Sequence, residues 1–140
     1  MQRARDLQRI FSIARERRFP VQIHTGRYDM HNSCEFYLPF CKRFSDVNVD
    51  LAHGQPVSKA MLALRETDNV YIDTSFIPHD EIRKLFFSAP EKVMFGTDFP
   101  APLRYFANNG KKLIQKEIDF AKNISTDKFL YANAKKFLEK

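Results

Sequence analysis

The sequence predicts an α/β fold made of parallel βα units, and two observations carry this prediction. The first is a strict alternation of β-rich runs with amphipathic helical segments, which is typical of parallel strands joined by right-handed crossovers. The second is that three of these runs, within residues 19–24, 47–53 and 93–98, lead into a His, a His and an Asp. Because parallel strands bring their carboxyl ends to one face, this pattern indicates one shared site.

Apolar periodicity and turn signals predict the individual elements in order. Residues 3–18 form an expected amphipathic helix, because apolar side chains recur there at helical spacing. Asn32, followed by Glu35 three residues later, predicts the start of a second helix. The expected strands are residues 21–23, 47–51, 70–73 and 92–95. The other expected helices start at Pro56 or Val57, cover 80–88 and 111–123, and follow a cap at Ser125 or Thr126, with irregular chain after Pro100 and Pro102.

Length and composition indicate one ordinary globular domain over residues 1–140. A hydrophobic content of 44% and a charged content of 29% are enough for a real core. The chain is nevertheless shorter than the roughly 200 residues that a full eight-stranded barrel requires. The net charge of +6 is spread along the chain without a nucleic-acid motif, which favours a solvated basic surface. An arginine-rich first helix leaves a weak anionic contact open.

The two cysteines predict reduced thiols. On one helix Cys34 and Cys41 would lie two turns apart, about 10 Å along the axis, which is too far for a disulfide. The N-terminus shows no signal peptide, and the apolar runs are too short to span a membrane. These features predict a cytoplasmic protein without a membrane partner.

Three side chains at expected strand ends are the candidates for chemistry: His24, His53 and Asp98. Each alone is more often a structural residue, but the repeated position favours a site. Neutral imidazole and carboxylate bind zinc or a similar divalent metal, which activates water and polarises a carbonyl. An aspartate beside that water can be both ligand and general base. A histidine that is not bound to metal can donate a proton or hold an oxyanion.

Five short motifs, in residues 21–26, 51–54, 70–75, 95–100 and 131–137, resemble the C-terminal half of the amidohydrolase superfamily. The similarity is greatest to the amidohydrolase-related branch, which includes aminocarboxymuconate-semialdehyde decarboxylase and dicarboxylate lactone hydrolases. The resemblance implies a half barrel of the TIM type, whose strands correspond to strands five to eight of a (β/α)8 barrel.

The resemblance also implies roles for the three candidate residues. His24 matches the fifth-strand metal ligand, and His53 matches a sixth-strand catalytic acid or substrate-polarising group. Asp98 matches the eighth-strand metal ligand and general base. The implied cofactor is a divalent metal, with zinc as the expected ion. The family's His-X-His pair on strand one is absent from this chain, so only weak metal binding is expected.

Other polar residues near the strand ends have weaker expected roles. Arg27 and Arg104 are candidates to hold a substrate carboxylate, although a solvated position is commoner for such arginines. Asp73 and Ser75 could support the site residues or simply form a turn. Two further histidines are expected in surface loops: His31 and His79.

Two functions follow from this resemblance, and the missing strand-one pair separates them. The first is metal-dependent hydrolysis, or non-oxidative decarboxylation as in a lyase, of a small carboxylated or cyclic substrate. The alternative is a truncated, catalytically inactive half barrel that acts as an oligomeric or interaction module. An open sheet leaves two edges and one face without cover, so the expected partner is a second copy or a chain that supplies the missing barrel half. No nucleic-acid partner is expected.

Overall fold

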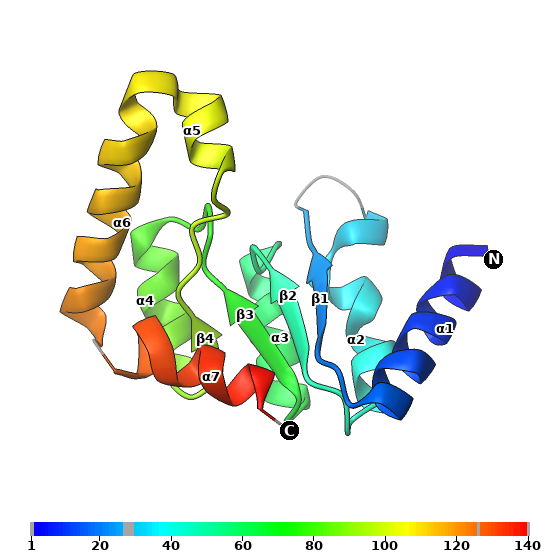
Figure 1. Ribbon diagram of the computed structural model, residues 1–140. Coiled ribbons are helices and arrows are strands. Elements are labelled where there is room, and N and C mark those ends of the chain that lie inside the picture. Colours follow the sequence, from blue (N-terminus) through cyan, green and yellow to red (C-terminus); the bar gives the residue numbers. More distant parts are fainter. Residues whose placement is uncertain (1, 27–29, 126, 140) are drawn as a thin grey trace.

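Four parallel strands form one sheet in the order β1-β2-β3-β4, which confirms the predicted fold class (Figure 1). The computed structural model describes residues 2–26, 30–125 and 127–139. The strands are β1 (Val21–His24), β2 (Val49–Ala52), β3 (Val70–Asp73) and β4 (Val93–Met94). The helices are α1 (Gln2–Arg17), α2 (Cys34–Arg43), α3 (Val57–Glu66), α4 (His79–Ser88), α5 (Ala101–Phe106), α6 (Gly110–Ile124) and α7 (Asn133–Leu138).

The main core lies between one face of the sheet and the helices behind it. Alternate strand residues point into this layer because successive side chains of a strand face opposite sides. Val49, Leu51 and Ile72 are completely buried there. Phe11 from α1 and Phe129 near the C-terminus are equally buried in the same cluster. These helices therefore fix one face of the sheet and leave the other free to carry polar groups.

The opposite face of the sheet is partly covered by α7. Figure 1 shows this helix crossing in front of the amino ends of β3 and β4. The ring of Phe137 packs against Tyr71, with 5.4 Å between ring centroids, and Met94 belongs to the same small cluster. The chain itself thus covers part of the face that a half barrel was expected to leave open.

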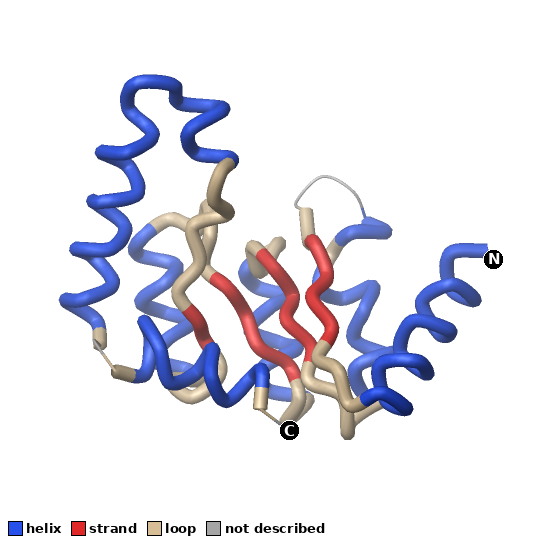
Figure 2. Tube along the Cα trace, viewed as in Figure 1, coloured by secondary structure: helices blue, strands red, loops and turns tan. Residues whose placement is uncertain are grey.

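Strands β2 and β4 have other bounds than the predicted 47–51 and 92–95, and the predicted cap of α2 and the predicted irregular chain after Pro100 were wrong. Ser33, rather than Asn32, caps α2, because its side chain accepts a hydrogen bond from the backbone N–H of Phe36. The chain after Pro100 was expected to be irregular but forms α5, which packs with α6 into a helical hairpin beyond the sheet (Figure 2). Proline is tolerated in the first turn of a helix, where its missing N–H has no intrahelical partner to lose, so Pro102 does not prevent α5.

The segment before the last helix is a π-helical turn, Lys128–Ala132, that continues directly into α7. The Ser125 hydroxyl oxygen accepts a hydrogen bond from the backbone N–H of Lys128 at 3.2 Å, as one of the two predicted caps would. The other predicted cap, Thr126, lies outside the described residues. Asn133 then ties α7 to the sheet, since its amide donates to the carbonyl oxygens of Pro90 and Val93 at 2.8 Å each.

Both cysteines lie buried on α2 as free thiols, as the sequence predicts. Burial raises the pKa of Cys34 and of Cys41 to about 12, so both remain protonated and unreactive at neutral pH. In the described part of the chain, every helix is too short or too polar to cross a lipid bilayer.

Candidate functional site

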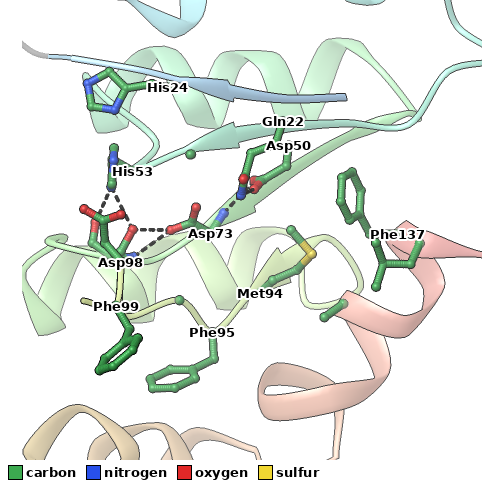
Figure 3. A pocket seen from close by; sticks show the side chains of 15 residues that line it. Gln22, His24, Asp50, His53, Asp73, Met94, Phe95, Asp98, Phe99 and Phe137 are labelled. Atoms are coloured by element: carbon green, nitrogen blue, oxygen red, sulfur yellow. Dashed lines mark hydrogen bonds between the residues drawn. The ribbon is translucent and has the colours of Figure 1, made fainter. Parts of the chain in front are cut away.

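A cavity of about 540 Å³ lies on the sheet face opposite the main core (Figure 3). Its polar lining comes from β1, β2 and β3 and from the segments that follow β2, β3 and β4: Gln22, His24, Asp50, His53, Asp73, Ser75 and Asp98. Its apolar lining includes Met94, Phe95, Phe99 and Phe137. The three candidate residues therefore line one cavity, although each comes from a different βα unit.

Thr25 holds the ends of β1 and β2 together, and so positions the two histidines. Its buried hydroxyl donates to the carbonyl oxygen of Ala52 at 2.6 Å and accepts from the backbone N–H of Gln55 at 2.8 Å. The rings of His24 and His53 meet edge to face with 4.7 Å between centroids. Sequence reasoning missed Thr25, whose only signal was its position directly after a strand-end histidine.

Two site residues have left-handed backbone conformations. The φ angle is 69° at His53 and 52° at Asp98, a region that residues other than glycine seldom adopt. Gly54, with φ of 49°, continues the turn, and a Cβ there would lie 2.7 Å from Ile72. Such conformations cluster at functional sites, where the surrounding structure supports their cost of about 1–3 kcal/mol. The backbone thus aims both side chains at the cavity by sharp local turns.

Ser75 contacts His53 through the Nδ1 atom of the ring. The Nδ1 atom of His53 lies 2.7 Å from the Ser75 hydroxyl oxygen and 3.2 Å from the Ser75 carbonyl oxygen. The Ser75 hydroxyl in turn donates to Asp73 Oδ1, which also accepts from the Ser75 backbone N–H at 2.9 Å. The structure therefore shows both roles that the sequence left open: Asp73 Oδ1 and the Ser75 backbone N–H form a turn contact, and the Ser75 side chain contacts the site residue His53.

Asp50 extends this polar network into the sheet. Its Oδ1 accepts from the backbone N–H of Asp73 at 3.0 Å, and its Oδ2 accepts from the Gln22 amide at 2.8 Å. Burial and the nearby charge of Asp73 raise the pKa of Asp50 to about 7. Sequence reasoning did not single out Gln22 or Asp50. The available signal was a polar residue between two apolar ones in each strand, which marks the face away from the core.

The other predicted residues do not line the cavity in the described part of the chain. Arg27 falls outside the described residues, and Arg104 is exposed on α5, away from the cavity lining. His31 lies in a short 3-10 helix, with its ring against Phe36. The expectation that His79 lies in a surface loop was wrong.

His79 is the first residue of α4, where α6 packs over it. Its ring stacks on Phe120 with 3.6 Å between centroids. Its Nε2 lies 2.9 Å from Glu117 Oε2. Contacts over such sequence distances could not be read from the local pattern.

The donor types at the cavity suit zinc, but the donor number does not complete a site. His24 and Asp98 provide an imidazole and a carboxylate, whereas catalytic zinc sites use three protein ligands and structural sites four. Within residues 2–26, 30–125 and 127–139, no cluster of three or more His, Cys, Asp or Glu side chains is placed to hold a metal. His24 and Asp98 alone would thus supply at most part of a coordination shell.

We expect this chain alone to bind zinc weakly, with a dissociation constant on the order of micromolar or higher, because its shell is incomplete and only partly preorganised. Titration calorimetry should show that His24→Ala weakens this binding further. His79→Ala, which changes a histidine outside the cavity, serves as the matched control. Stoichiometric zinc that survives a strong chelator, or equal binding by the His24→Ala variant, would contradict the expectation.

Comparisons with known proteins agree with the parallel α/β fold described above. The sequence model of the amidohydrolase family matches residues 2–140. Among solved structures, the chain is similar to "Amidohydrolase 2 from Bifidobacterium longum subsp. infantis", with a TM-score of 0.68 and 17% sequence identity. The alignment covers 91% of this chain and 52% of that one, so this chain spans about half the length of the solved structure. No curated protein matches. Because the family match extends over nearly the whole sequence, the chain belongs to the amidohydrolase family, as a domain with half of a barrel-type sheet.

Proposed function

We propose that this chain carries the C-terminal half of a metal-dependent hydrolase site for a small carboxylated or cyclic substrate. The observation that supports this most is that His24, His53 and Asp98 line one cavity. A volume of about 540 Å³ falls in the range of pockets for small molecules. Membership of the amidohydrolase family makes hydrolysis the leading reaction, and non-oxidative decarboxylation on the same residues is the variant.

In this proposal each residue has a separate task. His24 and Asp98 would hold a divalent metal, with zinc as the expected ion. When bound, the metal supplies a Lewis acid that activates water and polarises a carbonyl. The Asp98 carboxylate is exposed beside the cavity and takes a proton from the attacking water. His53, in its protonated form, donates a proton to the departing or developing negative group.

An interaction module is the second candidate, and the two outer strands of the described sheet favour it. Strands β1 and β4 are the outer strands of the described sheet and offer backbone groups for pairing. The proposed partner is a second copy of this chain or a chain that carries the missing barrel half. Such a partner would also add the ligands that a complete metal shell needs.

The test compares hydrolysis by the zinc-loaded protein and by two aspartate variants. Small lactones and carboxylated amides are the substrates, and the mass in solution is measured for every sample. Asp98→Asn is expected to lower the rate by about 100-fold or more, because it removes the general base and a ligand. Asp119→Asn, an exposed site on α6 away from the cavity, is the matched control. A wild-type chain that is inactive both as monomer and as oligomer would reject the enzyme and leave the interaction module.

A further inference from the structure

We propose that Asp73 and Ser75 are positioning residues that lock neutral His53 in the tautomer with its proton on Nδ1. The other ring nitrogen, Nε2, is then the proton-accepting atom of this cavity residue. The inference rests on the proposed function, in which His53 transfers protons. It goes further by assigning the direction of that transfer and the two groups that set it.

The first line of evidence is the Ser75 carbonyl group. Its oxygen lies 3.2 Å from His53 Nδ1 and can only accept a hydrogen bond. Nδ1 must therefore be the donor in this contact. A neutral imidazole carries one ring proton, so Nε2 is left with its lone pair.

The second line of evidence is the Ser75 hydroxyl, and it is independent of the first. The hydroxyl has one proton, which it donates to Asp73 Oδ1. Its oxygen, 2.7 Å from His53 Nδ1, can then only accept from that nitrogen. Both contacts thus require the same tautomer.

The direction of the hydroxyl follows from its contacts with Asp73. The backbone N–H of Ser75 donates to Asp73 Oδ1 and so keeps that oxygen beside the Ser75 side chain. The Ser75 hydroxyl donates to the same oxygen. Asp73 therefore holds the Ser75 hydroxyl toward itself, and the hydroxyl proton is not available to His53.

The fold leaves room for this arrangement at one glycine. A Cβ on Gly96, just after β4, would lie 2.6 Å from Asp73 Oδ1. Any larger residue would push the carboxylate away from Ser75. Ser75 itself is only 3% exposed, so water does not compete freely for its hydroxyl. The chain from Asp73 through Ser75 to His53 is thus enclosed on the side away from the cavity.

The tautomer restricts what His53 can do. A neutral His53 cannot polarise a substrate carbonyl through Nε2, because that nitrogen carries no proton. It first accepts a proton from solvent at Nε2, because the attacking water gives its proton to Asp98. The imidazolium that forms keeps its Nδ1–H contact with Ser75 and can then pass the Nε2 proton to a leaving group.

The test is the tautomer itself, measured by long-range 1H–15N NMR of the histidine rings in the metal-free protein at mildly alkaline pH. His53→Gln identifies the signal. Wild type is expected to show predominantly the Nδ1–H form. Asp73→Ala should lower the fraction of the Nδ1–H form, because the freed Ser75 hydroxyl can donate to Nδ1 in competition with the contact to the Ser75 carbonyl.

Three further variants make the result specific. Asp73→Asn keeps an acceptor oxygen that the Ser75 backbone N–H orients, so it should retain the wild-type tautomer. Ser75→Ala should give a mixture, since only the carbonyl contact remains. Ser88→Ala, which changes the hydroxyl at the far end of α4, should have no effect.

A predominant Nε2–H signal in wild type would overturn the proposal. So would an Asp73→Ala variant with an unchanged tautomer, and if that variant fails to fold, wild type and Asp73→Asn still decide. In an active preparation, Ser75→Ala should lower kcat by about 10- to 100-fold with little change in KM. Because the NMR measurement needs neither metal nor turnover, the expected tautomer in an inactive protein would reject the hydrolase function alone.

Discussion

Asp50→Asn is expected to remove the loss of stability that ionisation of Asp50 causes between about pH 4 and pH 7. Burial and the Asp73 charge raise the pKa of Asp50 from 3.8 to about 7 in the folded protein. The folded state therefore holds a proton through this window that the unfolded state has lost. The contribution of Asp50 to the free energy of unfolding is therefore fully present below about pH 4 and is lost as the pH rises toward 7. The loss is at most about 4 kcal/mol, because each pKa unit is worth roughly 1.4 kcal/mol.

Asparagine resembles the protonated aspartic acid without titrating. Its carbonyl oxygen can still accept from the Asp73 backbone N–H, and the Gln22 amide can rotate to accept from the new amide group. Urea unfolding at several pH values should thus give a flatter profile for Asp50→Asn, with a relative gain above pH 7. Asp80→Asn, at an exposed carboxylate on α4, is the control. Wild-type and Asp50→Asn profiles that run parallel would show that Asp50 is already ionised at low pH in the folded protein.

Phe129→Ala is expected to destabilise the protein by about 3–5 kcal/mol, a large part of the stability of an ordinary domain. Phe129 is completely buried, and its ring packs against Phe86 and Phe95 with centroids 5.4 and 6.0 Å apart. Its carbonyl oxygen also accepts from the Phe95 backbone N–H at 2.9 Å. Truncation leaves a cavity between α4, the chain after β4 and the π-helical turn, and thus loosens the C-terminal segment that lines the site.

Denaturant unfolding at a fixed pH measures this loss. Phe87→Ala, on the exposed side of α4 where the ring is 75% accessible, is the matched control and should change stability by about 0.5 kcal/mol or less. Similar midpoints for the two variants would mean that the π-helical turn does not contribute to the cooperative core.

Local patterns predicted the order of strands and helices because each signal lies within one element. The third strand, Val70–Asp73, has the predicted bounds. The fourth is shorter than expected, since its described pairs with β3 are Val93 and Met94. The helix α5 was missed because prolines near a helix start resemble those of a loop. Such errors arise because proline is common both in the first turn of a helix and in loops.

Sequence reasoning could predict only the candidate residues at the strand ends, and not the groups that support them. His24, His53 and Asp98 were found because strand ends can be read from sequence, and the chemical roles assigned to them remain predictions. Their supporting groups depend on contacts between separate units. Thr25 acts on the next βα unit, and Gly96 makes room for a carboxylate more than twenty residues earlier. The left-handed backbone at His53 and Asp98 also follows from tertiary packing, because local preference opposes it.

Because β1 is an edge strand of the described sheet, local unfolding should affect His24 more than His53. His53 directly follows β2, which is paired on both sides, whereas His24 is the last residue of β1, which pairs with β2 alone among the described strands. Fraying of β1 would carry His24 away while the group formed by His53, Ser75 and Asp73 remained intact. Border strands open at lower free energy than central ones. The His53 side of the cavity is therefore more stable against local unfolding than the His24 side. The hydrogen bonds of the Thr25 hydroxyl connect the two sides.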